Sequence, residues 1–309
     1  MLLNYLLLIL MVIIWSFSFI IVDITVEFIP PLSVALYRFI IASFTFLIID
    51  LYLILKKKTS KRNSFMIKPE NAKFSRNDWI LIIFSSLSGV SLFFLTQYNA
   101  INLIGPSLPA LFVCLLAPVL ISILALIFFN EKLSRLKILG FLIATIGGFL
   151  LVTGGNIQNI TPESPNFLGY LLALITPLLW AIYSTLTKRI SKVNSSNKLN
   201  KYISYFGSIE LLLFIIINNE FTIFIENFFN ITLFLCAIYL GIGCYVIGYY
   251  IWQNSQNKLK SSKVASFLYI EPFLTLLFSI ILKRTETIVF WNIMGGIIVL
   301  LAVLIINYE

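Results

Sequence analysis

Residues 5–15 read Tyr5-Leu-Leu-Leu-Ile-Leu-Met-Val-Ile-Ile-Trp15, and residues 170–180 read Tyr170-Leu-Leu-Ala-Leu-Ile-Thr-Pro-Leu-Leu-Trp180. In both stretches a tryptophan follows a tyrosine by ten residues, and nearly every residue between them is apolar. A long apolar run of this kind predicts a helix that crosses a bilayer. Its return half a chain later indicates that one helical unit occurs twice.

Later segments of the two halves also correspond. Pro118 in the first half matches Pro272 in the second, and Tyr98 and Trp252 each stand twenty residues before the matching proline. We therefore expect two domains, a first repeat over residues 1–155 and a second over residues 166–309. Duplicated runs of helices are common in secondary transporters, which hold their substrate between the two halves.

The composition indicates a membrane protein. The chain is 60% hydrophobic and 11% charged, whereas about a quarter of the residues of a soluble domain are charged. The apolar blocks lack the alternation of β-barrel strands. Measured against the roughly 20 residues that a helix needs to cross a bilayer, they predict ten spans, at residues 5–24, 32–55, 79–98, 106–129, 135–153, 168–187, 202–218, 231–252, 264–282 and 288–306. The first span is expected to stay in place, because it lacks the features of a cleaved signal peptide.

Most basic residues fall in every second connection between these spans. They are Lys56, Lys57, Lys58, Lys61, Arg62, Lys68, Lys73 and Arg76, then Lys132, Arg135 and Lys137, then Lys188, Arg189, Lys192, Lys198 and Lys201, and finally Lys258, Lys260 and Lys263. Basic loops stay in the cytoplasm, so both termini are predicted to be cytoplasmic, in the cell membrane. This distribution also argues against a nucleic-acid partner, despite the net charge of +9.

The charge pattern adds an orientation to the repeat. Five spans per repeat make the second repeat enter the membrane from the opposite side, which is an inverted repeat. The predicted fold class is thus all-α, a polytopic membrane protein of about ten transmembrane helices in two inverted five-helix repeats.

Three charged residues fall well inside predicted spans: Arg38, Glu210 and Glu271. A charge near the centre of a bilayer costs about 2.5–3.5 kcal/mol on insertion scales, so such residues usually pair or serve a function. The planar guanidinium of Arg38 suits a carboxylate or phosphate of a substrate. A structural ion pair with Glu210 or Glu271, or a hydrogen bond to helix carbonyls that lack a partner, explains it equally well.

Glu271 directly precedes Pro272 in the ninth predicted span. Proline removes a helix hydrogen bond, and paired interruptions in two halves indicate a central site. We therefore expect helix breaks at Pro118 and Pro272. Because the chain has no histidine, Glu271 is the best candidate for carrying a coupling proton, with Glu210 as a less secure one. A structural role remains the alternative for both.

The two repeated tryptophans lie in the middle of their spans, with hydroxyl-bearing residues close behind each. An aromatic wall with a few polar groups suits a mostly apolar cavity, although packing between the repeats explains the same pattern. The predicted substrate-binding residues are Trp15, Arg38, Tyr98, Trp180, Tyr183, Trp252 and Tyr269. Gly147-Gly148 and Gly295-Gly296 are typical of close helix contacts. The three cysteines lack metal-ligand spacing, so we expect no metal and no cofactor.

These features resemble the drug/metabolite transporter superfamily, and within it the EamA-type ten-helix permeases. The resemblance covers nearly the whole chain and rests on the order of its motifs. They are Trp15-Ser-Phe-Ser-Phe, Pro30 followed by Arg38, Tyr98-Asn-Ala, the Pro118-to-Glu131 spacing, Trp180-Ala-Ile-Tyr183 with Lys188-Arg189, Glu271-Pro272, and the Glu286-to-Gly295 spacing. The chain departs from the family at Ser16, where glycine is frequent, and around Glu286.

The resemblance implies a permease that works by alternating access on amino acids, related metabolites, nucleotide-linked compounds or drugs, often as an exporter. We therefore expect a secondary transporter of a small metabolite, an amino acid or a related compound. A flippase of lipid-linked, nucleotide-linked or drug-like substrates is the alternative. An enzyme is not expected, because the chain lacks histidine and any clustered catalytic motif. The oligomeric state stays open.

Overall fold

The computed structural model describes residues 2–59, 74–129, 135–191, 195–259, 264–284 and 288–307. Within these ranges all regular secondary structure is helical, so the predicted all-α class is confirmed. Glu131 and Glu286, which belong to the repeated motif spacings, and most of the basic stretch 56–76 lie outside the described residues.

The single helices are α1 (Leu2–Thr25), α2 (Pro31–Thr59), α5 (Ser107–Phe129), α6 (Arg135–Thr153), α7 (Phe167–Ser191), α8 (Ser196–Ile217) and α14 (Phe290–Asn307). Three more are composite: α3 (Arg76–Ser86), η1 (Leu87–Ser91) and α4 (Leu92–Ile104); α10 (Ile231–Ile238), η3 (Tyr239–Tyr249) and α11 (Tyr250–Lys258); η4 (Ser266–Ile270) and α13 (Glu271–Ile281). Two short elements, η2 (Ile157–Ile160) and α9 (Phe221–Asn227), lie in connections.

The helix lengths fit a membrane protein. Among the described residues, seven helices are long and apolar enough to cross a membrane by length and composition, and three shorter apolar helices follow the remaining predicted spans. Three boundaries differ from the prediction by about six residues: α4 ends at Ile104, α11 ends at Lys258, and α8 begins at Ser196 and not near residue 202. The Ser195 side chain caps this helix by accepting from the backbone N–H of Lys198. Hydropathy does not detect such a polar first turn.

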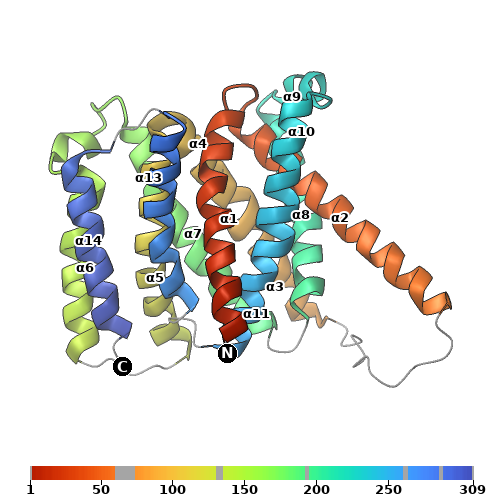
Figure 1. Cartoon of the computed structure of the whole chain (residues 1–309), viewed down its shortest axis with the longest axis horizontal. Coiled ribbons are helices and arrows are strands. Elements are labelled where there is room, and N and C mark those ends of the chain that lie inside the picture. Colours follow the sequence, from red (N-terminus) through yellow and green to blue (C-terminus); the bar gives the residue numbers. More distant parts are fainter. Residues whose placement is uncertain are drawn as a thin grey trace.

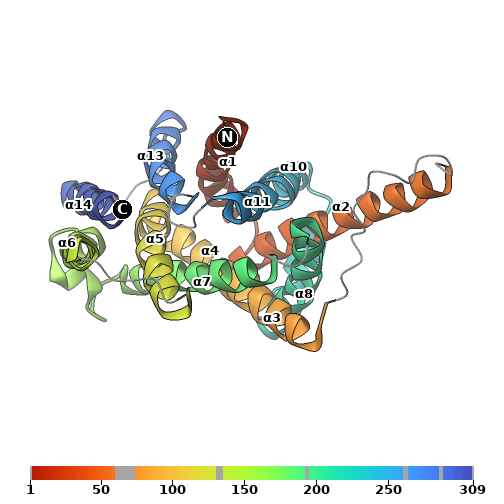
Figure 2. The ribbon, with the colours of Figure 1, turned by 90° about the horizontal axis from the view of Figure 1, so that it is seen from below.

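The helices pack side by side, and α6 and α14 form a pair at one end of the molecule (Figures 1 and 2). Glycine makes this pair close: a Cβ at Gly147 would lie 3.0 Å from the carbonyl oxygen of Gly295. A Cβ at Gly295 would meet the backbone nitrogen of Leu151 at 2.3 Å. The predicted close helix contact at these glycines is confirmed, because any larger residue would push the two backbones apart.

α1 begins and α14 ends at the same face of the bundle, the lower face in Figure 1. We call it the terminal face. The last turns of α2 project away from the other helices on this side (Figure 2). The main core joins apolar side chains of both halves, among them Met11, Phe39 and Phe94 from the first half and Tyr183 and Tyr245 from the second. The two halves therefore share one interior.

Two membrane helices contain a π-helical segment, η1 in the third and η3 in the eighth. Each holds a glycine against an aromatic ring of the other half. A Cβ at Gly89 would lie 2.0 Å from the Tyr183 ring, and a Cβ at Gly248 would lie 2.4 Å from Nε1 of Trp15. π-helical segments occur often at functional sites, and these two border the centre of the protein.

Candidate functional site

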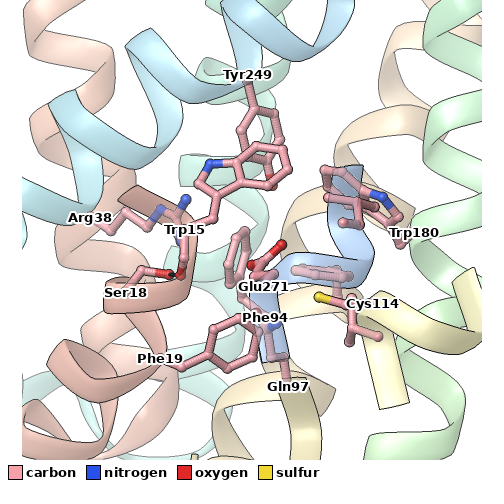
Figure 3. A pocket seen from close by; sticks show the side chains of 13 residues that line it. Trp15, Ser18, Phe19, Arg38, Phe94, Gln97, Cys114, Trp180, Tyr249 and Glu271 are labelled. Atoms are coloured by element: carbon pink, nitrogen blue, oxygen red, sulfur yellow. Dashed lines mark hydrogen bonds between the residues drawn. The ribbon is translucent and has the colours of Figure 1, made fainter. Parts of the chain in front are cut away.

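A cavity of about 40 Å³ lies between the two halves of the chain (Figure 3). Its lining comes from α1, α2, α4, α5, α7, η3, η4 and α13. The residues that line it are Trp15, Ser18, Phe19, Arg38, Phe93, Phe94, Gln97, Val113, Cys114, Trp180, Tyr249, Leu268 and Glu271. This volume is smaller than the about 300–1,000 Å³ that small-molecule sites usually have.

Arg38 reaches this cavity from α2 and is only 4% exposed. Its Nη1 donates to the hydroxyl of Tyr98 at 2.9 Å, and its Cζ lies 4.4 Å from the ring centroid of Phe94. The buried Nε has no hydrogen-bond partner among the described residues. The guanidinium is thus oriented by one phenol and one aromatic face, and it keeps donors for an anionic group.

Glu271 borders the same cavity from the first residue of α13 and is 3% exposed. Its Oε2 has no hydrogen-bond partner among the described residues, and Cys114 lies beside it (Figure 3). One turn further, Thr275 donates to the backbone carbonyls of Ser16 and Glu271 at 3.1 and 3.0 Å. The bond to Ser16 joins α13 to α1, and the bond to Glu271 lies within α13.

Arg38 does not form an ion pair with either membrane glutamate in the part of the chain that the structure describes. The geometry therefore does not support the ion-pair alternative for Arg38. One side of the cavity instead carries a cationic group, and another carries a carboxyl group.

An aromatic cluster covers the cavity on the side of the terminal face. The ring of Trp15 lies 5.6 Å from Trp180, 5.7 Å from Tyr249 and 5.9 Å from Trp252, measured between centroids. Trp15 Nε1 also donates to the carbonyl oxygen of Cys244 in η3 at 3.0 Å. Because α1 starts at the terminal face, Trp15 lies one turn nearer to that face than Phe19 does.

The other predicted binding residues lie around this cluster. Tyr98 touches Arg38, and the ring of Tyr183 packs against Trp180 at a tilt, with centroids 5.2 Å apart. Trp252 is fully buried behind Trp15. Tyr269 belongs to a separate apolar cluster with Phe112. The structure thus brings all of the predicted set except Tyr269 to the cavity or its aromatic cover.

Glu210 lies elsewhere, on α8. Its two carboxylate oxygens accept from Ser86 Oγ at 2.6 Å and from Ser91 Oγ at 2.5 Å. Ser86 precedes η1 and Ser91 ends it, so the carboxylate joins both ends of the π-helical segment. Glu210 is not among the residues that line the central cavity, which indicates that it holds η1 in place.

The two prolines behave differently. α5 continues as an α-helix through Pro118, so the expected helix break is wrong there. A single lost N–H is tolerated in a membrane helix, where neighbouring groups can compensate for it. Pro272 instead follows a change of helix type, from 3₁₀ in η4 to α at Glu271. At the start of a helix the missing N–H costs little.

Sequence reasoning missed several lining residues, including Phe94, Gln97, Cys114 and Tyr249. A signal existed for some of them, because Phe94 stands one turn from Tyr98 and Tyr249 stands one turn from Trp252 on the same helix faces. Gln97 is adjacent to Tyr98 and lines the cavity directly. The sequence around these residues does not show which helix faces meet in the folded protein.

On the face opposite the termini, Arg284 links two connections. Its Nε donates to Asp23 Oδ2 at 2.5 Å, and its Nη2 contacts the carboxylate of Glu27. Burial would lower the pKa of Arg284, but the hydrogen bonds to Glu27 and Asp23 outweigh it and raise the pKa above its ordinary value. This cluster joins the end of α1 to the end of α13.

In the described part of the chain, no group of three or more His, Cys, Asp or Glu residues is placed to hold a metal ion.

The fold and the cavity define a class: a polytopic α-helical membrane protein with a polar and aromatic cavity between two halves. The sequence profile of the EamA-like transporter family matches residues 2–153 and again residues 167–308. The chain belongs to the EamA-like transporter family.

Curated relatives and a solved structure are consistent with this family. An uncharacterized transporter of Archaeoglobus fulgidus is 26% identical over 303 residues, covering 97% of this chain and 96% of its own length. The uncharacterized transporter YyaM of Bacillus subtilis is 24% identical, with coverage of 91% and 85%. A crystal structure with 15% identity aligns with a TM-score of 0.61 over 99% of this chain and 96% of its own, and it supports the fold alone.

The protein is therefore a multi-pass membrane transporter and not an enzyme. The predicted resemblance to the drug/metabolite transporter superfamily is confirmed. The bilayer is its surroundings, and a small molecule is its cargo.

Proposed function

We propose that this protein is a secondary transporter that moves an amino acid or a related small metabolite across the cell membrane by alternating access, in the direction of export. The single observation that carries the proposal is the pair of opposite charges at one cavity. Arg38 and Glu271 both border the central space, both are buried, and each keeps a polar atom without a partner among the described residues.

This pair suits a zwitterion. The guanidinium of Arg38 offers a planar fork for a carboxylate, and the Glu271 carboxylate offers an acceptor for an ammonium group. A buried charge without a partner costs free energy, so a ligand that carries both opposite charges would be stabilised on both sides at once. A singly charged solute would leave one of the two groups without a partner.

The aromatic cluster supports a ligand with an apolar part. Trp15, Trp180 and Tyr249 present ring faces and edges to the cavity beside the two charged groups. Aromatic walls with a few polar groups are typical of small-molecule sites. An amino acid with an apolar side chain has the matching distribution of polar and apolar atoms.

Two repeats provide the means of alternating access. We assign them to residues 1–155 and 166–309, and the two family matches, at residues 2–153 and 167–308, support this division. In carriers built from inverted repeats, one unit rocks against the other around a central site. The cavity residues come from both repeats, as that motion requires.

Proton coupling would fall to Glu271. A carboxyl group that faces the substrate can hold either a proton or the substrate ammonium group, but not both at once. Export of a zwitterion would then accompany proton entry through the same oxygen atoms. Glu210 is the weaker candidate, because it binds two serine hydroxyls outside the lining of the cavity.

Counterflow in proteoliposomes tests the proposal. Liposomes are loaded with one unlabelled compound, and uptake of labelled amino acids is measured against three competitors: the amino acid, its amide and its N-acetyl derivative. The expected result is strong competition by the amino acid alone, because the amide lacks the carboxylate and the acetyl derivative lacks the ammonium group. Equal competition by all three would contradict the zwitterion site.

A matched pair of variants connects this result to Arg38. Arg38→Gln should abolish the preference for a free carboxylate, whereas Lys201→Gln should keep it. Lys201 is also a cation in a membrane helix, but it pairs with Asp50 at 2.8 Å and lies outside the lining of the cavity. Identical behaviour of the two variants would remove Arg38 from the binding site.

A flippase of lipid-linked or drug-like substrates is the second candidate. It is favoured by an apolar recess of about 430 Å³ between α5, α6 and α7, lined by residues such as Leu120, Phe149 and Leu174. A recess of this size beside the central cavity could hold an acyl chain. Absence of counterflow for every amino acid, in protein that is demonstrably folded, would support this candidate.

A further inference from the structure

Between the central cavity and the terminal face, buried polar side chains of three membrane helices bind one another. Gln253 of α11 donates from Nε2 to the Tyr183 hydroxyl of α7 at 3.0 Å and to Asn200 Oδ1 of α8 at 2.6 Å. Tyr245 of η3 donates to the backbone carbonyl of Asn200 at 2.9 Å. We call Tyr183, Asn200 and Gln253 the polar lock.

The chain direction places this lock on the side of the terminal face. Tyr183 follows Trp180 by about one turn on α7, which runs toward that face, and Gln253 follows Trp252 on α11, which also ends there. Asn200 stands near the start of α8, which begins at the same face. The lock therefore lies directly beyond the aromatic cover of the cavity.

Several polar atoms around the lock have no hydrogen-bond partner among the described residues. They are Ser184 Oγ, Asn200 Nδ2, Gln253 Oε1 and both side-chain polar atoms of Gln256. Gln256 is 3% exposed and stands about one turn from Gln253, closer to the terminal face. The group thus forms a polar strip that extends from Trp180 to the end of α11.

Such a strip is costly in a sealed helix bundle. Buried polar groups normally have partners, and each group without one calls for an explanation. Apolar side chains of similar size would fill the same space without this cost. The cost is explained if these atoms meet water or a polar solute in a second conformation of the carrier.

We infer that this strip is the closed half of the transport pathway and that the polar lock is the gate between the cavity and the terminal face. The inference rests on the proposed function as a carrier. Closure combines two parts, the aromatic rings that cover the cavity and the hydrogen bonds of Gln253 that join α7, α8 and α11. Opening separates these helices and exposes Ser184 and Gln256 to the aqueous phase.

The π-helical segment η1 holds the gate from the first half of the chain. Gly89 leaves no room for a Cβ beside the Tyr183 ring, so the ring is packed directly against the backbone of η1. Tyr183 cannot move away from Gln253 without a change in this contact. The gate therefore closes across the boundary between the two halves, where a rocking motion would open it.

Thiol labelling of a cysteine at position 256 tests the gate. Gln256→Cys is placed in the full-length protein in nanodiscs, and the rate of its reaction with a charged thiol reagent is measured by mass spectrometry of the peptide. Lys258→Cys, at an exposed position two residues further along, gives the rate for an open site. The closed gate should make Gln256→Cys react much more slowly than Lys258→Cys.

Removal of one lock bond should raise the rate. Tyr183→Phe in the Gln256→Cys background is expected to speed the reaction by about two- to tenfold, the effect of one lost hydrogen bond on an equilibrium. Tyr205→Phe is the matched control. This variant also removes a buried hydroxyl, but Tyr205 takes no part in the lock. Gln253→Leu serves as a second lock variant if Tyr183→Phe fails to fold.

Two results would overturn the inference. The first is that Gln256→Cys reacts as fast as Lys258→Cys while the polar lock is intact. The second is that Tyr183→Phe and Tyr205→Phe give the same rate in the Gln256→Cys background. Labelling needs no transported substrate, so absence of amino-acid counterflow would leave this result unaffected. If the labelling results contradict the gate, the competition test for the zwitterion site still stands.

Discussion

Arg38 and Glu271 are the two residues whose chemistry most limits what this transporter can carry. Arg38 comes from the first half of the chain and Glu271 from the second, yet both border one cavity. Neither is neutralised by the other, because Arg38 bonds to Tyr98 and faces the ring of Phe94. At the residue scale, the proposed function thus depends on two polar groups that remain available to a ligand.

The shape of the Arg38 side chain should matter as well as its charge. Arg38→Lys is expected to lower the transport rate at limiting substrate by about tenfold or more, since a charge-assisted hydrogen bond is worth about 1.5–3 kcal/mol and lysine lacks the planar fork. Initial rates of counterflow would measure this. Wild-type rates in the lysine variant would show that only the charge is used.

The proton role of Glu271 is testable by separating exchange from coupled uptake. Glu271→Gln keeps the size of the side chain but cannot release a proton, so a pH gradient should no longer drive transport while counterflow persists. Glu210→Gln should keep the response to the pH gradient, because Glu210 lies outside the lining of the cavity. Proton-driven transport that survives in Glu271→Gln would exclude the coupling role.

At the scale of single elements, the two π-helical segments connect the halves of the chain. η3 provides the carbonyl of Cys244 to Trp15, and Tyr239 in the same segment donates to the carbonyl of Ile14 at 2.7 Å. The part of α1 that contains Ile14 and Trp15 is thus fixed to η3, more than two hundred residues further along the chain. Glu210 holds η1 through its two serines in a similar way.

Two glycines of η3 allow a matched test of this packing. Gly248→Ala is expected to lower the stability by about 1–3 kcal/mol, the usual cost of overpacking, because its Cβ would lie 2.4 Å from Trp15 Nε1. Gly243→Ala should be neutral or slightly stabilising, because the nearest atoms to its Cβ are 3.9 Å away and alanine favours helices. Thermal unfolding in detergent would compare them.

Equal unfolding temperatures for the two alanine variants would contradict this assignment. They would mean that Trp15 can move away from η3 without cost, and so that the aromatic cover is loosely held.

At the scale of the whole molecule, orientation follows from the distribution of charge. The described helix ends at the terminal face carry several lysines and arginines, among them Arg76, Lys188, Arg189, Lys201 and Lys258. The opposite face carries Asp23 and Glu27, which bind Arg284. Basic loops remain in the cytoplasm. We therefore propose that the terminal face is cytoplasmic and that the polar lock closes the cytoplasmic side.

Fusions with reporter proteins test this orientation. Green fluorescent protein fused after Glu309 should fluoresce, because it folds in the cytoplasm, and alkaline phosphatase at the same position should be inactive. Phosphatase inserted after Asn156, in the connection between α6 and α7, is the opposite control and should be active. Exchanged activities would reverse the topology and place the polar lock on the outer side.

The helical class, the spans and the repeat are all predicted from the sequence. Apolar blocks of membrane length have no stable alternative to helices, because lipid offers no partner for the backbone. Gly147 and Gly295 likewise indicated a close contact, because only small residues permit one. Trp15 and Trp180 were found by repetition, and Arg38 and Glu271 by the cost of charge in a bilayer.

Tertiary structure alone decided how these residues meet. It separated Glu210 from the cavity, placed Tyr269 in another cluster and carried α5 through Pro118 without a break. It also produced the π-helical segments and the polar lock, which depend on which helix faces touch. Hydropathy gives the environment of a helix but not the rotation of that helix about its axis, because in lipid the packing of neighbouring side chains sets this rotation.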